Sequence, residues 1–264
     1  GISCGQRAAP GAIERVRIDP DTLEPKVKVI GIDIWSDEEG FDAASGAIGV
    51  TGVCGSAIIE VVAEMYLSGI ISEDGVIDGT CAARSDRIVE DGRTFSYVLW
   101  RGEQELKITQ TDIRAIQLAK AALYAGIKLL MDKQGIQQVD SISFAGAFGT
   151  FIDPKYAMVL GLIPDCDLKN VKAVGNAAGY GAKMALLNRT YRREIEETVT
   201  RIEKIETALE PDFQDHFVNA MAMPNKVDPF PNLGEVVNLP QKKALGSGAD
   251  DEDGGRRRRR RARA

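Results

Sequence analysis

Two stretches of the chain combine a short apolar strand pattern with a glycine-rich turn and a helix start, and this combination restricts the fold most. Residues 141–153 read SISFAGAFGTFID, and residues 174–183 read VGNAAGYGAK. Glycine tolerates positive φ and leaves no side chain between backbone and ligand, and N–H groups at a helix start favour an anion. Because strand, turn and helix in this order are typical of α/β proteins, we predict that both turns are walls of one nucleotide site. The alternative is that the glycines serve only packing or turn geometry, their commoner role at such junctions.

Two long helices are predicted from apolar residues at helical spacing. One covers residues 56–70. The other opens at Thr109, which is placed to cap it, with Asp112 complementing the helix dipole, and it ends before Gly135. Lys120 interrupts the apolar stripe of this second helix. We interpret it as a lysine at the edge of the stripe, with its stem buried and its amine in water; a phosphate contact is the alternative.

The remaining patterns are weaker. Residues 96–108 predict a hairpin, residues 189–209 a charged, exposed covering helix, and residues 211–221 a last helix. From residue 223 the periodicity fades, and acidic residues followed by an arginine run predict a disordered tail. A solubilising role is the default for this tail, with contact to RNA or anionic lipid as the alternative.

Charge and length exclude some classes of function. The formal net charge of −6 argues against a general nucleic-acid binder. The longest uncharged run, residues 43–59, is shorter than the about 20 apolar residues that a membrane-spanning helix needs. We therefore expect no membrane insertion and no nucleic-acid partner.

The cysteines and the histidine exclude further classes. Cys4, Cys54, Cys81 and Cys166 lack the spacing of metal ligands, so we expect reduced thiols in a cytoplasmic protein and neither a metal site nor an iron–sulfur cluster in this chain. His216 is the only histidine, which argues against a His-rich zinc site and against a Ser-His-Asp triad.

Several motifs follow one another in a fixed order along residues 1–222. They are GISCGQRAAPGAIE (1–14), GVCGS (52–56) with Glu60 and Glu64, ITQTDIR (108–114) with QLAKAA (117–122), AGAFG (145–149) with Ile152 and Asp153, GLIPD (161–165), and VGNAAG (174–179). Taken together, this series resembles the reductive activators of corrinoid-dependent methyltransferases. Each motif alone would be unspecific.

The resemblance implies an α/β fold with a ribonuclease-H-like mixed sheet flanked by helices: most of one actin-like ATPase subdomain of the acetate and sugar kinase, heat-shock ATPase and actin superfamily, plus covering helices. We expect this domain to span residues 1–222, and residues 223–264 to be an extended segment and tail. The family carries a [2Fe-2S] domain ahead of that core and uses ATP, with Mg, to return a Co(II) corrinoid protein to Co(I). The implied partner is the corrinoid protein of a methyltransferase system, and a homodimer is allowed.

The resemblance also implies which residues bind the nucleotide. They are Gly146, Ala147, Phe148 and Gly149, which match the adenosine-side glycine turn of the family, and Asn176, Gly179 and Gly181, which match the segment that closes the second subdomain. No catalytic residue is assigned.

The chain departs from the family pattern in two respects. Residues 31–35, GIDIW, are the nearest string to the aspartate-glycine-threonine hairpin that holds phosphate and magnesium in this superfamily, but they lack the second glycine and the threonine. The cluster cysteines are also absent. We therefore expect a piece of a longer protein that does not turn over ATP unaided. Two alternatives remain: a small-molecule kinase of the same superfamily, and a non-enzymatic docking domain for a corrinoid protein or methyltransferase.

Overall fold

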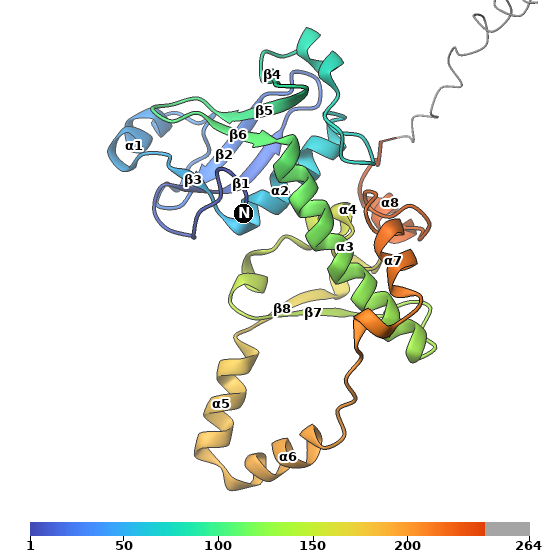
Figure 1. The fold of residues 1–264 in the computed structure, drawn as a ribbon. Helices are drawn as coiled ribbons and strands as arrows, with labels where there is room; N and C mark the ends of the chain where they lie inside the picture. The colour runs from blue at the N-terminus through green and yellow to red at the C-terminus, as the bar shows by residue number, and fades with distance from the viewer. Residues whose placement is uncertain (241–264) are drawn as a thin grey trace, which may run out of the picture.

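The computed structural model describes residues 1–240, and its strands form three small sheets (Figure 1). The first sheet has the order β2-β1-β3, with β1 (Ala12–Ile18) antiparallel to β2 (Pro25–Val29) and parallel to β3 (Gly52–Val53). Helix α1 (Phe41–Ile48) precedes β3, and α2 (Gly55–Leu67) follows it. Nearly every side of α2 is buried, as expected for a helix packed against both a sheet and a second helix.

The second sheet is an antiparallel meander in the order β4-β5-β6. It contains β4 (Ile88–Asp91), β5 (Thr94–Trp100) and β6 (Leu106–Thr109), and the short 3₁₀ helix η1 (Gly79–Ala83) precedes it. The hairpin predicted from residues 96–108 is confirmed as the β5–β6 pair.

Helix α3 (Gln110–Lys133) starts where β6 ends and runs past the first two sheets to the third (Figure 1). The predicted cap is present: the Asp112 N–H donates to Thr109 Oγ1 (3.1 Å), and the Thr109 N–H donates to Asp112 Oδ2 (3.0 Å). At 24 residues the helix is about 36 Å long, so it spans the body of the molecule.

The third sheet pairs β7 (Ile142–Ala145) in parallel with β8 (Val171–Gly175). A parallel pair needs a crossover connection. This one contains η2 (Phe148–Phe151), α4 (Pro154–Leu160) and η3 (Leu168–Asn170). The crossover helix α4 packs against α2, which brings the third sheet next to the first.

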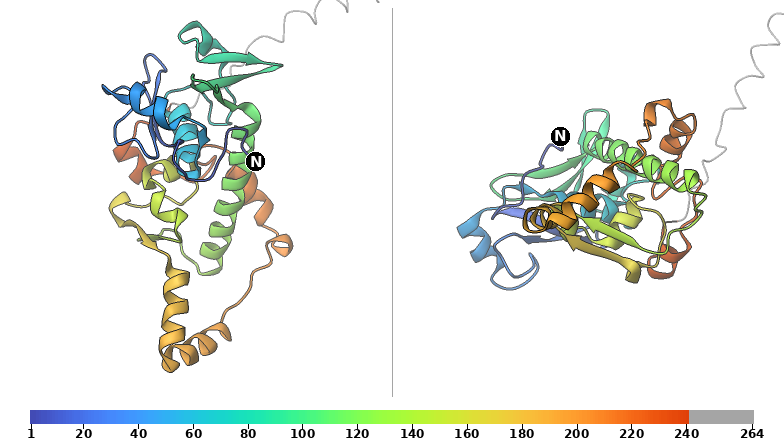
Figure 2. Two further views of the ribbon diagram at one scale, coloured as in Figure 1. Left: turned by 90° about the vertical axis from the view of Figure 1, so that its left-hand side faces the viewer. Right: turned by 90° about the horizontal axis from the view of Figure 1, so that it is seen from below.

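Helices α5 (Ala177–Leu187) and α6 (Arg189–Val199) project from the rest of the fold as an arm (Figures 1 and 2). Neither helix buries a residue. The charged helix predicted for residues 189–209 therefore ends earlier, at Val199, and covers no core. The chain then returns through η4 (Thr207–Leu209) to α7 (Phe213–Asn219), which packs against α3.

The segment after α7 is packed where the sequence pattern indicated extended chain. It includes α8 (Pro231–Val236), with Met223, Phe230 and Leu233 buried in the core. The acidic and arginine-rich tail falls in residues 241–264, outside the described residues. In residues 1–240, no helix has both the length and the apolar composition to cross a bilayer.

Lys120 corrects the sequence interpretation. Its side chain is fully buried instead of reaching water, because the segment after α7 covers this face of α3. The Nζ atom donates to the carbonyl oxygens of Ala222 and Pro224, the latter at 3.0 Å. Burial lowers the pKa of the Lys120 amine to about 7. The lysine thus fixes a segment about a hundred residues away in the sequence.

We expect the stability contributed by Lys120 to depend on pH. The unfolded-state pKa of lysine is about 10.4, so between about pH 7 and pH 10 the unfolded chain binds the extra proton. The free energy of unfolding should therefore rise with pH, by up to about 1.4 kcal/mol per unit. We expect urea titrations from about pH 7.5 to 9.5 to show that the free energy of unfolding of the wild type rises with pH relative to that of Lys120→Met. A constant difference would contradict a depressed pKa for Lys120.

Gly161 predicts a second stability effect. It ends α4 at φ +71°, and a Cβ there would overlap the carbonyl oxygen of Pro224. Gly161→Ala should lower the free energy of unfolding by about 3 kcal/mol or more, since backbone strain and overlap add. Gly135→Ala is the matched control: it shares the positive φ (+66°) but has open space, so about 1 kcal/mol is expected. Equal losses in thermal or urea unfolding would mean that the close approach to Pro224 is unimportant.

Candidate functional site

The two glycine turns singled out in the sequence leave the same edge of the third sheet. β7 and β8 are parallel, with Ile142 opposite Val171, so their carboxyl ends meet. At that edge the Gly146 N–H donates to the Gly175 carbonyl oxygen at 2.7 Å. The fold therefore brings the starts of the two turns into direct contact.

The first turn presents bare backbone. Gly146 has φ +108°, and a Cβ built on it would meet no atom within 4 Å, so the space above it is open. Gly149 is buried, and a Cβ there would lie 3.1 Å from the Cβ of Phe144. Only glycine allows both this conformation and a close approach by a ligand at Gly146.

A hollow of about 470 Å³ lies beside the first turn. It is lined by Ile59 of α2, Leu123 of α3, residues 143–149 and 152 of β7 and the β7–α4 connection, Ala157 of α4, and Leu162 and Ile163, which follow that helix. Gly146, Ala147, Phe148 and Gly149 are all among these lining residues. A largely apolar wall beside a glycine turn with open space above it suits a flat apolar group that also carries polar atoms, such as a nucleobase.

The second turn has a different local role. Asn176 caps α5, its Oδ1 accepting a hydrogen bond from the Gly179 N–H at 2.9 Å. A Cβ on Gly179 would lie 2.6 Å from the Asn176 amide nitrogen, so glycine here keeps the cap geometry. Gly181 sits in open space on α5. These three residues follow the sheet edge but do not line the hollow.

Gly175 is a residue that the sequence reasoning left out of the site. It has φ +68° and accepts the hydrogen bond from Gly146, so it forms the junction between the turns. The sequence signal that could have identified it is its position at the end of a predicted strand, where the turn begins. Gly179, which the sequence predicted as a site residue, lies about one helical turn beyond Gly175, inside α5.

Phe148 connects the first turn to the start of α2. Its ring lies so close to Gly55 that a Cβ there would be 2.6 Å from a ring carbon. The outer part of the ring stays in solvent, with Phe148 54% exposed. The approach of this aromatic ring therefore explains the second glycine of the GVCGS motif, Gly55.

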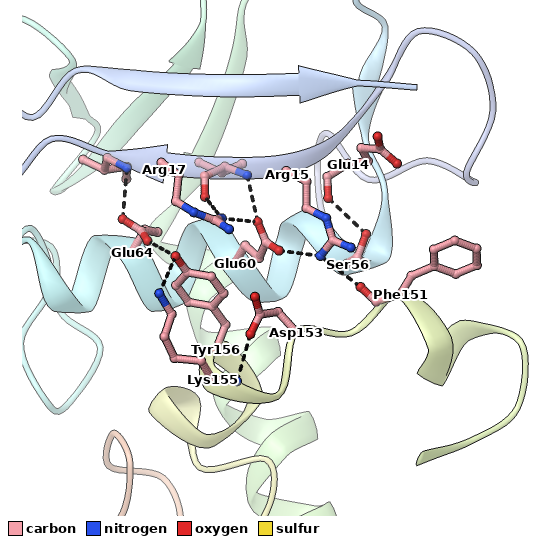
Figure 3. A network of polar contacts seen from close by, with 12 residues as sticks. Glu14, Arg15, Arg17, Ser56, Glu60, Glu64, Phe151, Asp153, Lys155 and Tyr156 are labelled. Atoms are coloured by element: carbon pink, nitrogen blue, oxygen red, sulfur yellow. Dashed lines mark hydrogen bonds and ion pairs between the residues drawn. The ribbon is translucent and has the colours of Figure 1, made fainter. Parts of the chain in front are cut away.

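Behind the turn, two carboxylates of α2 face the edge of β1 (Figure 3). Glu60 Oε2 accepts from the Val16 N–H (2.9 Å), and Glu64 Oε2 accepts from the Ile18 N–H (3.0 Å). Tyr156 of α4 donates its hydroxyl to the other oxygen of Glu64. Burial, followed by this hydrogen bond to Glu64, raises the pKa of Tyr156, which keeps the hydroxyl protonated as the donor.

Two arginines of β1 neutralise Glu60. Arg15 Nη1 lies 2.7 Å from Glu60 Oε1, and Arg17 Nη1 lies 2.7 Å from Glu60 Oε2. Arg15 Nη1 also donates to the carbonyl oxygen of Phe151, the last residue of η2, at 3.2 Å. The network therefore joins β1, α2 and the end of the first glycine turn.

In residues 1–240, no group of three or more His, Cys, Asp and Glu side chains is arranged to hold a metal ion. None of the four cysteines forms a disulfide, and Cys54, Cys81 and Cys166 are buried.

Known proteins share both this sequence and this fold. The chain is 31% identical to the corrinoid activation enzyme RamQ of Eubacterium limosum over 235 residues, which cover 84% of this chain and 37% of RamQ. A solved structure of a reductive activator for corrinoid, iron-sulfur protein superimposes with a TM-score of 0.71 at 33% identity, covering 85% of this chain and 34% of that one. The chain thus spans little more than a third of the length of either relative.

The α/β fold expected from the motifs is that of the relatives, which confirms the predicted fold class. The family model described as the C-terminal domain of RACo, the ASKHA domain, matches residues 1–234. The chain belongs to this family of corrinoid-activator ASKHA domains.

Proposed function

We propose that this chain is the nucleotide-binding C-terminal part of an ATP-dependent reductive activator, which returns a Co(II) corrinoid protein to Co(I). The observation that carries the proposal is the pair of glycine turns joined at one sheet edge, with a largely apolar hollow beside the first. The names of the relatives supply the reaction class. In this proposal the adenine lies in the hollow against residues 146–149, and residues 176–181 border the site.

The chemistry explains why a nucleotide site belongs in such a protein. In this reaction a reduced [2Fe-2S] cluster outside this chain would supply one electron to the corrinoid substrate, whose cobalt would go from Co(II) to Co(I). For a one-electron step, every ~59 mV of uphill potential is a tenfold penalty. ATP bound to the activator can offset this penalty only if it favours a state in which the corrinoid protein is docked or its cobalt ligand is altered. The contribution of this chain is to hold the nucleotide.

A docking role is a second candidate, because the α5–α6 arm exposes large apolar side chains. Tyr180, Leu186 and Leu187 of α5 are 66%, 76% and 70% exposed. Contiguous exposed apolar surface commonly marks a protein interface. A corrinoid protein or methyltransferase is the partner proposed for it, and the two roles are compatible within one domain.

Calorimetric titration of the chain with Mg-ATP tests the leading proposal. We expect saturable heat for the wild type and at least about tenfold weaker binding for Gly146→Val, because the valine side chain enters the open space above the turn. Gly149→Val should weaken binding too, by displacing Phe144 and the turn.

Gly92→Val is the control for backbone strain. Gly92 also has a positive φ (+63°) and open space, but it lies in the β4–β5 turn. The Gly92→Val variant should bind Mg-ATP with the affinity of the wild type. If Gly146→Val and Gly149→Val bind Mg-ATP as tightly as the wild type, the nucleotide binds elsewhere. If the wild type gives no heat of binding, docking is left as the role of the chain.

A further inference from the structure

Arg15 of β1 bonds to the end of the first glycine turn. Its Nη1 carries two hydrogens and meets two acceptors, Glu60 Oε1 at 2.7 Å and the Phe151 carbonyl oxygen at 3.2 Å. Phe151 is the last residue of η2, which follows the turn directly. One amino group therefore bridges the helix α2 and the end of the turn (Figure 3).

The anchor of this bridge is rigid. Glu60 is fully buried and belongs to α2, where it also accepts from the Val16 N–H and from Arg17. Moving this carboxylate would break several hydrogen bonds and ion pairs of a buried charged group at once, which is costly. Because Arg15 is held by Glu60 of α2, its bond to the Phe151 carbonyl oxygen holds the end of the turn at a fixed place relative to α2.

Apart from the packing of Phe148 on Gly55, few hydrogen bonds hold the turn. Thr150 makes local bonds only, its N–H to the Ala147 carbonyl (3.3 Å) and its hydroxyl to the Gly146 carbonyl (3.4 Å). The first end of the turn is fixed by the Gly146 bond to Gly175. In the part of the chain that the structure describes, Arg15 supplies the hydrogen bond that joins η2 to another element.

We propose that Arg15 is a positioning residue for the nucleotide turn: it holds the far end of residues 146–151 so that their backbone is preorganised for a ligand. This inference rests on the proposed nucleotide site. Arg15 does not line the hollow and is not expected to touch the ligand. Its effect comes from the ordering cost that a loose turn would add to binding.

Arg17 is an unusually close control within the same network. It binds the same carboxylate at the same 2.7 Å, and its side chain is 32% exposed against 30% for Arg15. Arg17 makes no bond to η2. Its guanidinium instead lies over the rings of Trp35 and Tyr156, with centroids at 5.6 and 4.8 Å. Replacing Arg17 should therefore cost at least as much stability without releasing the turn.

The test compares Arg15→Met, Arg15→Lys and Arg17→Met in the full chain. Two quantities are measured: Mg-ATP affinity by calorimetry, and hydrogen exchange of the backbone of residues 146–151 without nucleotide. Arg15→Met should weaken binding about tenfold and speed exchange in this segment. Arg17→Met should leave both unchanged while lowering the melting temperature at least as much. Arg15→Lys should recover part of the affinity, because an ammonium can still donate to a carbonyl oxygen.

The outcomes separate this inference from the function on which it rests. If the wild type binds no nucleotide, the proposed function fails, and the exchange measurement decides by itself whether Arg15 holds the turn. If the wild type binds and both Met variants weaken binding equally, Arg15 only compensates the charge of Glu60 and the inference is overturned. Unchanged exchange in Arg15→Met overturns it as well. Should Arg15→Met fail to fold, Arg15→Lys against Arg17→Lys gives the same comparison.

Discussion

The carboxylates of Glu60 and Glu64 take the place of a neighbouring strand along one edge of β1. Leaving the Val16 and Ile18 N–H groups unpaired in the core would cost about 1–3 kcal/mol each, and an unpaired buried carboxylate would cost more. Satisfying both at once lets α2 lie directly on the strand with nearly all of its surface buried. The position of α2 in turn positions α4, which packs on it and donates a hydrogen bond from Tyr156 to Glu64.

The glycine turn depends on this arrangement in two ways. Its aromatic residue, Phe148, rests on Gly55 at the start of α2, and its far end is bonded to Arg15, which is itself held by Glu60. The turn is thus open at Gly146, where a ligand would approach, and supported at Phe148 and Phe151. Polar groups that are fully paired and buried are well suited to such support, because they permit few alternative arrangements.

A second group of buried polar contacts joins α3 to the segment after α7. Lys120 and Gln117 of α3 both donate to backbone carbonyls of residues 221–224, so the C-terminal segment lies against α3 although it is remote in sequence. By contrast, the α5–α6 arm has no such bonds to the core and exposes its apolar residues. The same chain therefore combines a tightly held body with an arm whose apolar surface is available for contact.

The sequence by itself determined most of the local structure and the fold class. The cap at Thr109, the hairpin around residues 96–108 and the two strand-turn-helix units follow from spacing and turn chemistry, which act over a few residues. It could not determine that Lys120 would be buried, because the segment covering it lies about a hundred residues further along. Nor could it separate the first turn, which lines the hollow, from Asn176 and Gly179, which cap a helix. Only the tertiary structure decided those roles, since they depend on which backbone meets which side chain across the fold.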